Sequence, residues 1–180
     1  TPVPPVAVTR FHRIVPPETM PPGSYAIVAG TPGIDPSFAA AVSRQLDLLG
    51  FHAASGGAAE TPAYQVNIQV AREQRRVNTS SGVDVGGGAS VGSYGSGVGV
   101  GVGIDLTRLF AGRGSGDLVT TRLAVRIARP TQAQPLWEGR AETSARGNAP
   151  AAQSALAADK LASALFSGFP GTSGETITVP

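Results

Sequence analysis

Residues 83–104 constrain the fold of this chain more than any other segment. They read VDVGGGASVGSYGSGVGVGVGI, so valine alternates with glycine or serine, and no charged side chain occurs between Val85 and Ile104. Alternation with a period of two is typical of an extended strand, because successive side chains leave opposite faces. The Gly-Ser-Tyr-Gly-Ser-Gly run at 92–97 favours a turn. We therefore expect a long glycine- and valine-rich β-hairpin over residues 82–106, inserted into a larger domain.

One face of this hairpin would carry apolar side chains, and the other would be nearly bare backbone. Flat, uncharged strands are templates for pairing with another chain, so we expect the protein to associate with itself here. Insertion into a membrane and a mobile loop remain alternatives, since each arm approaches the roughly 9–11 residues of a membrane-crossing strand. The expected self-association interface consists of Val91, Tyr94, Val98, Gly99, Val100, Gly101, Val102, Gly103 and Ile104.

The remaining sequence predicts an α+β fold. Asp35 and Pro36 are typical of a helix start, and Gly50 of a helix end, which predicts a helix over residues 36–49. An alanine-rich run predicts a second helix over about 150–166. Each helix has one apolar stripe, so both should cover the same face of a mostly antiparallel sheet. The expected strands are residues 6–11, 25–29, 64–70, 118–128, 136–144 and 176–179.

Composition excludes several function classes. Charged residues make up 14 % of the chain and the net charge is +2, so no strong field would attract nucleic acid. The absence of cysteine excludes disulfides, thiolate nucleophiles and thiolate-bound metals. We therefore expect neither a nucleic-acid partner nor a cysteine-based site.

The domain follows a proline-rich start. Residues 1–5 read TPVPP, an extended leash, and a single domain is expected over 6–180. Such a leash suits an exported protein whose acylated N-terminal residue is absent from this chain, and a trimmed N-terminus explains it equally well. No run of about 18 apolar residues is present, so no membrane-spanning helix is expected.

The sequence contains no recognisable catalytic, cofactor or metal motif. His12 and His52 are the two histidines, and neither has a partner at metal-ligand spacing, so a structural role is expected for both. The glycine motifs alternate through strands instead of joining a strand to a helix, which argues against a nucleotide site. Trp137 should be buried on the sheet face that also carries Gly139 and Ala141. We expect no enzymatic activity and no cofactor.

Several short motifs resemble the DUF4136 family of bacterial envelope lipoproteins. They begin with Tyr25-Ala26-Ile27, the helix that ends in the LGFH sequence of residues 49–52, and the AYQVNI sequence of residues 63–68. They continue with the glycine-rich residues 97–105, the LWEGRA sequence of residues 136–141, and the LFSGFPG sequence of residues 165–171. The resemblance implies an exported, lipid-anchored α+β domain without known catalytic residues.

These observations favour a structural role in the bacterial envelope. The leading hypothesis is a non-enzymatic outer-membrane lipoprotein that assembles with itself into a ring, tube or filament through the hairpin. The alternative is a periplasmic lipoprotein that binds a lipid or a partner protein. The expected partners are therefore other copies of the chain and the outer membrane, reached through an N-terminal lipid anchor.

Overall fold

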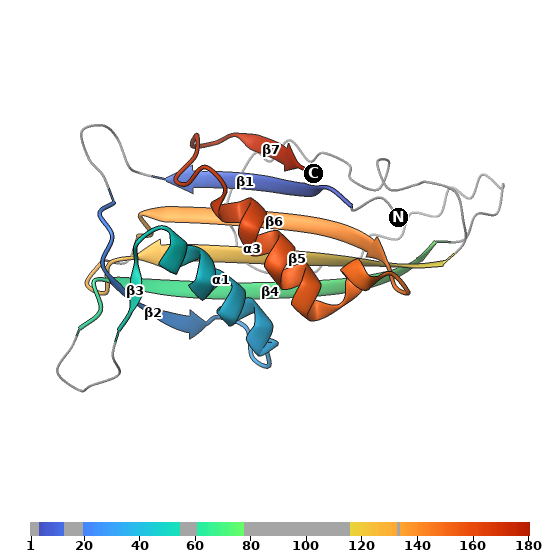
Figure 1. The fold of residues 1–180 in the computed structure, drawn as a ribbon, viewed down its shortest axis with the longest axis horizontal. Helices are drawn as coiled ribbons and strands as arrows, with labels where there is room; N and C mark the ends of the chain where they lie inside the picture. The colour runs from blue at the N-terminus through green and yellow to red at the C-terminus, as the bar shows by residue number, and fades with distance from the viewer. Residues whose placement is uncertain (1–3, 13–19, 55–60, 78–115, 133) are drawn as a thin grey trace.

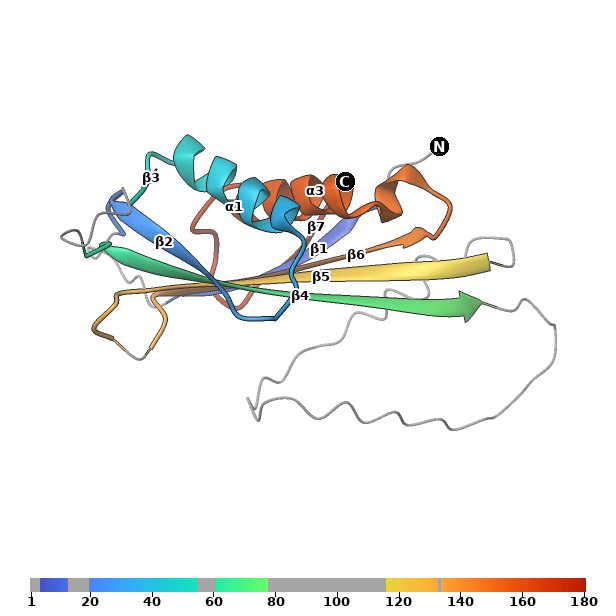
Figure 2. The same cartoon turned by 90° about the horizontal axis from the view of Figure 1, so that it is seen from below.

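The protein forms one mixed β-sheet covered on one face by two helices (Figures 1 and 2). The computed structural model describes residues 4–12, 20–54, 61–77, 116–132 and 134–180. The strand order is β3-β2-β4-β5-β6-β1-β7. The elements are β1 (Val6–His12), β2 (Ser24–Ala29), α1 (Pro36–Leu48), β3 (His52–Ala53), β4 (Tyr64–Val77), β5 (Gly116–Ala128), β6 (Trp137–Arg146), the 3₁₀ turn η1 (Pro150–Ala152), α3 (Ser154–Phe166) and β7 (Thr176–Val179).

The α+β fold class is confirmed, but the sheet is mixed. The strands β4, β5, β6, β1 and β7 are antiparallel to their neighbours in that series. In contrast, β2 pairs in parallel with both β3 and β4. The chain leaves β2 through α1 before it returns to the sheet, and such a helical crossover brings the next strand back in the same direction. The prediction of a mostly antiparallel sheet overlooked this β2–α1–β4 crossover.

The first helix begins and ends where its capping residues predict. The Asp35 carboxylate accepts a hydrogen bond from the Ser37 N–H at 2.9 Å, and Pro36 occupies the first turn. Gly50 follows the helix with a φ of +93°, a conformation that side chains with a Cβ disfavour. The buried side of α1 is formed by Phe38, Ala41, Val42 and Leu46.

The second helix is shorter than predicted. Gln153 has an extended backbone, with φ −70° and ψ 138°, and separates the η1 turn from α3. The Arg72 side chain from β4 donates hydrogen bonds to the Ala152 carbonyl before this break and to the Ser154 hydroxyl after it. The run at 150–166 is therefore a 3₁₀ turn followed by an α-helix.

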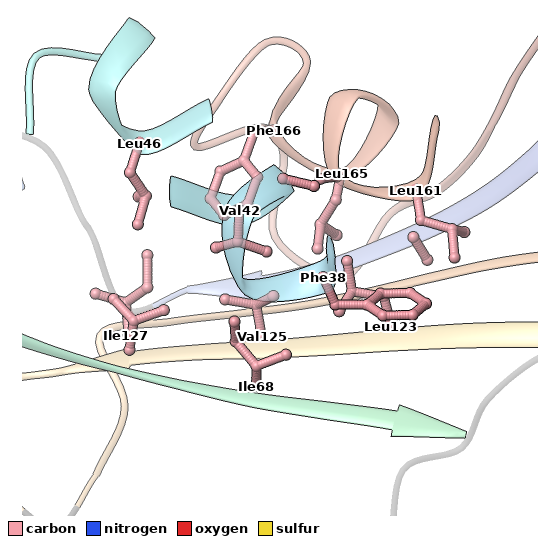
Figure 3. Packing of buried hydrophobic residues seen from close by; sticks show 14 of the residues in the cluster. Phe38, Val42, Leu46, Ile68, Leu123, Val125, Ile127, Leu161, Leu165 and Phe166 are labelled. Carbon is pink, nitrogen blue, oxygen red and sulfur yellow. The ribbon is translucent and has the colours of Figure 1, made fainter. Parts of the chain in front are cut away.

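The core lies between the helices and the sheet (Figure 3). Both helices cover the same face, as predicted, and they pack beside each other (Figure 2). Figure 3 shows Phe38, Val42 and Leu46 of α1 above the side chains of β4 and β5. The fully buried partners on these strands are Val66, Ile68, Leu123, Val125 and Ile127. Burial of one such side chain stabilises the fold by roughly 1.5–3 kcal/mol.

The antiparallel pair of β4 and β5 is longer than the sequence predicted. It extends from the pair Gln65 and Ala128 to the pair Val77 and Gly116. The pair therefore places Val77 and Gly116, the residues that flank 78–115, side by side at one end of the sheet. The predicted hairpin over residues 82–106 lies outside the described residues.

Candidate functional site

A shallow groove of about 400 Å³ lies where β1 ends and the chain turns from β5 into β6. Phe11 provides an apolar wall and is 47 % exposed. The groove is lined by Phe11, His12, Gln134, Pro135, Glu138 and Ser173.

His12 fastens the loop before β7 to the end of β1. Its Nε2 lies 2.8 Å from the Gly171 carbonyl oxygen. Its main-chain N–H donates to Ser173 Oγ at 3.0 Å, and that hydroxyl donates to the His12 carbonyl oxygen at 3.2 Å. The buried Nδ1 has no hydrogen-bond partner among the described residues. Because Nδ1 is buried and Nε2 is bonded to the Gly171 carbonyl, the contacts of His12 serve to hold the loop before β7 against β1.

His52 lies elsewhere, in the exposed two-residue strand β3. Its main-chain N–H donates to the Gly23 carbonyl at 3.1 Å, which pairs β3 with the start of β2. The two histidines are therefore not brought together. Within the described ranges, no three His, Asp, Glu or Cys side chains gather as metal ligands would.

The sheet face opposite the helices carries paired charges. The Glu138 carboxylate lies 3.4 Å from Arg126 Nε and 3.2 Å from Arg140 Nη2, and its side chain is 18 % exposed. Arg122 pairs with Glu142 across β5 and β6. Exposed ion pairs of this kind contribute about 0–1 kcal/mol each, so they serve mainly to keep this face polar. An antiparallel sheet with one wet face shows this pattern.

Trp137 joins the sheet to the C-terminal end of α3. It is fully buried, as predicted, and stacks on Phe166 with ring centroids 5.2 Å apart. Its Nε1–H donates to the Pro170 carbonyl at 3.0 Å. A Cβ on Gly139 would lie 2.5 Å from the Trp137 ring, which places the indole over this glycine on the same face. The prediction that small neighbours make room for the indole is confirmed.

Arg10 closes the same junction from β1. Its Nε donates to the Leu165 carbonyl at 3.0 Å, and its Nη2 donates to the carbonyls of Ala164 and Ser167. These carbonyls lie at the C-terminal end of α3, where helix carbonyls lose their intrahelical partners, so the guanidinium acts as a C-terminal cap. The Ala164 carbonyl also accepts the Ser167 N–H at 3.4 Å. Burial lowers the pKa of Arg10, and the nearby Glu175 carboxylate partly opposes this effect.

The predicted self-association residues all lie between 91 and 104, outside the described residues. The structure therefore does not test the interface formed by Val91, Tyr94 and the second arm of the hairpin. None of the helices in the described residues is long and apolar enough to cross a bilayer.

This architecture defines the class of the protein as a two-layer α+β domain, with one mixed sheet beneath two adjacent helices. The chain belongs to the family described as "Domain of unknown function (DUF4136)", whose sequence pattern matches residues 24–171. The match includes the Trp137 junction and most of the core. The resemblance seen in the short motifs is therefore confirmed.

Two further proteins are similar to this chain. Over an alignment of 65 residues the chain is 42 % identical to an uncharacterised protein of Zymomonas mobilis. The alignment covers 36 % of this chain and 24 % of that protein. A crystal structure of a PDZ domain protein from Parabacteroides distasonis superposes with a TM-score of 0.47 and 9 % identity. That alignment covers 97 % of this chain and 38 % of the other. The chain thus spans about a quarter and two fifths of the lengths of these two proteins.

Proposed function

We propose that the protein is a non-enzymatic lipoprotein of the bacterial outer membrane that assembles with itself through residues 82–106. The proposal is supported by the valine–glycine sequence between Val85 and Ile104, which has no charged side chain, and by the position of the flanking residues Val77 and Gly116 in the fold. Its partners would be further copies of the chain and, through an N-terminal lipid, the outer membrane.

The observation that carries the proposal is the length of the β4–β5 pair. This pair continues in unbroken register to Val77 and Gly116, beyond the part of the sheet that the helices cover (Figure 2). Residues 78–115 therefore start and end on two adjacent, antiparallel strands. A segment with strand-like alternation that begins from such a pair is well placed to present a flat edge to a neighbouring copy.

The start of the described chain is held against the domain, which bears on the proposed lipid anchor. The Lys160 ammonium of α3 donates to the Pro4 carbonyl, and the Thr143 hydroxyl of β6 donates to the Pro5 carbonyl at 3.1 Å. A lipid anchor on the N-terminal side of the domain would therefore join the chain where Pro4 and Pro5 are bonded to α3 and β6.

Size-exclusion chromatography with light scattering tests the assembly. Val100→Asp places a charge on the apolar face of the expected hairpin and should abolish the oligomer. Leu48→Asp is the matched control, because Leu48 is 79 % exposed on α1 and the same charge there should leave the oligomer unchanged. Assembly of the Val100→Asp variant at the wild-type mass would contradict the proposal, and so would a monomeric wild-type protein.

The groove beside Phe11 supports the second candidate, a periplasmic lipoprotein that binds a lipid or a partner protein. An exposed aromatic side chain in a concave surface is a common element of ligand sites. Titration calorimetry with a short-chain phospholipid below its micelle concentration tests the lipid form of this function. Binding that Phe11→Ala weakens would favour it, whereas the absence of heat with the wild-type protein would count against it.

A further inference from the structure

The outer edge of β2 carries free backbone groups. The Tyr25 carbonyl points to β3 and accepts the Ala54 N–H at 2.9 Å, whereas the Gly30 N–H points to β4 and donates to Ile68 at 2.7 Å. Backbone groups alternate in direction along a strand, so the N–H and C=O groups of Ile27 and Ala29 point outward with Tyr25. β3 pairs only with Ser24 and Tyr25, and among the described residues no other strand pairs with this edge at Ile27 and Ala29.

The opposite edge of the sheet, β7, is free in the same way. The Arg10 carbonyl points toward β7, because it accepts the Gly174 N–H at 2.8 Å. The even-numbered residues of β1 therefore bond β7, with Val6 opposite Val179 and Val8 opposite Ile177. Consequently, the backbone groups of Thr176 and Thr178 point outward, where the described residues offer no partner strand.

Neither open stretch carries a charged side chain. Natural edge strands are usually guarded by being very short, by charged side chains, lysine above all, by proline or by a bulge. Residues 26–29 read AIVA and residues 176–179 read TITV, so both stretches are four residues long and uncharged, and Pro180 follows the second. Two uncharged stretches of equal length can align along their whole length.

The direction of the strands determines how two copies can meet. β2 is parallel to β4, and the four antiparallel pairings from β4 through β5, β6 and β1 to β7 leave β7 in the same direction. Figure 1 shows the arrows of β2 and β7 pointing the same way. A second copy placed beside the first in the same orientation would therefore bring β7 of one next to β2 of the other as parallel strands.

We propose that β7 of one copy adds to β2 of the next as a parallel strand, so that the sheet continues from subunit to subunit. In the register that aligns both open stretches completely, Ile27 lies opposite Ile177 of the second copy. The Ile27 N–H then donates to the Thr176 carbonyl, the Thr178 N–H donates to the Ile27 carbonyl, and the Ala29 N–H donates to the Thr178 carbonyl.

The same register matches the two faces of the sheet. Tyr25 and Val8 lie on the buried, helix-covered face, so Ile27 and Ile177 extend that face by alternation and cross-strand pairing. Val28 and Thr178 lie on the polar face. The contact joins two different surfaces, so repetition gives a ring or an open filament. The inference rests on the proposed self-assembly and gives it a contact outside residues 82–106.

Engineered cysteines test this contact cleanly, because the chain has no cysteine of its own. Val28→Cys and Thr178→Cys variants are purified separately, mixed and oxidised. Opposite residues in paired strands lie within disulfide range, so the mixture should form a crosslinked dimer at least tenfold faster than either variant alone. A mixture of Leu48→Cys with Thr178→Cys is the matched control for random collisions.

The outcomes separate this inference from the proposed function. Light scattering that shows an oligomer without the Val28–Thr178 crosslink overturns the edge contact and leaves self-assembly standing. Crosslinking of the Thr178→Cys variant alone also overturns it, because that result requires β7 to meet β7. A monomeric wild-type protein overturns both.

A backbone variant provides a second test that does not depend on disulfide geometry. Thr178→Pro removes the outward N–H and leaves the bonds from Ile177 and Val179 to β1 in place. Loss of one interfacial hydrogen bond should raise the dissociation constant of the assembly about two- to tenfold. Thr178→Ala keeps the N–H and is the matched control. Equal assembly of the two variants overturns the inference.

Discussion

Gly139→Ala should destabilise the protein by overfilling the Trp137 junction. A Cβ at this position would lie 2.5 Å from the Trp137 Cη2 atom and 2.7 Å from the Leu165 Cδ1 atom. Carbon atoms in a packed core normally approach to about 3.5–4.0 Å, so both side chains would have to move by roughly 1 Å. Both are fully buried, and overpacking of such a site costs about 1–3 kcal/mol in the free energy of unfolding.

Urea unfolding followed by circular dichroism measures this cost. With a slope of about 1–3 kcal/mol per molar urea, a loss of about 2 kcal/mol lowers the midpoint by roughly 1 M. Gly147→Ala is the matched control, because the nearest atom to its added Cβ, Asp117 Cβ, is 3.5 Å away. We expect that variant to change the stability by no more than about 0.5 kcal/mol.

A double-mutant cycle assigns the cost to the indole. Trp137→Phe removes the outer ring atoms that the new methyl group would contact, so Gly139→Ala should cost less in that background. The coupling free energy should be about 1 kcal/mol, within the range for residues in direct contact. Equal costs in both backgrounds, or no cost in the wild-type protein, would refute the packing argument.

Two further predictions concern the caps of the helices. Arg10→Lys should lower the free energy of unfolding, measured in urea, by about 1–3 kcal/mol, because one ammonium cannot reproduce the guanidinium bonds to Ala164, Leu165 and Ser167. Arg44→Lys, at an exposed ion pair, is the control and should change it little. Hydrogen bonds from the Ser37 N–H and hydroxyl lower the pKa of Asp35, so its stabilising contribution is present above the unfolded-state pKa and is lost as the pH falls through the lower folded-state value. Asp35→Asn keeps a capping oxygen and should therefore reduce the loss of stability below about pH 4, as measured by urea midpoints, and an unchanged pH profile would argue against this role for Asp35.

Local sequence patterns predicted the elements whose two sides differ in polarity. The cap at Asp35 and the stop at Gly50 placed α1 correctly. The alternation in residues 118–128 and 136–144 predicted the antiparallel pair of β5 and β6. In each case one face packs in the core and the other meets water, so apolar residues recur with the period of the element, about 3.6 residues in a helix and two in a strand.

The same patterns failed where both faces are exposed. β4 continues through residues 71–76, which are all exposed, and the polar run AREQRR there has no apolar alternation to indicate a strand. The pairing with β5 maintains this part of β4. The parallel pairing of β2 with β4 was also missed, because strand direction depends on the path of the chain through α1 and no local sequence pattern indicates it.

Arg10 shows a signal that could have been found. Val6 and Val8 occupy the buried face of β1, and alternation places Arg10 on that same face. A buried arginine requires several acceptors, and the end of an amphipathic helix offers free carbonyls. The sequence does not reveal which helix ends beside Arg10, because 154 positions separate Arg10 from Ala164.

Several of the residues that carry the family resemblance serve the framework of the fold. Trp137, Gly139, Phe166 and Phe169 meet at one junction, and the polar groups there are already occupied: the indole N–H by Pro170 and the guanidinium by α3. The donors of this junction are therefore engaged within the fold. The two open strand edges, β2 and β7, lie apart from it and leave backbone donors and acceptors unpaired within the described chain. The proposed assembly would use these edges and residues 82–106, which include the shared motifs at 25–27 and 97–105, whereas the shared motifs at 136–141 and 165–171 form the junction that shapes the sheet.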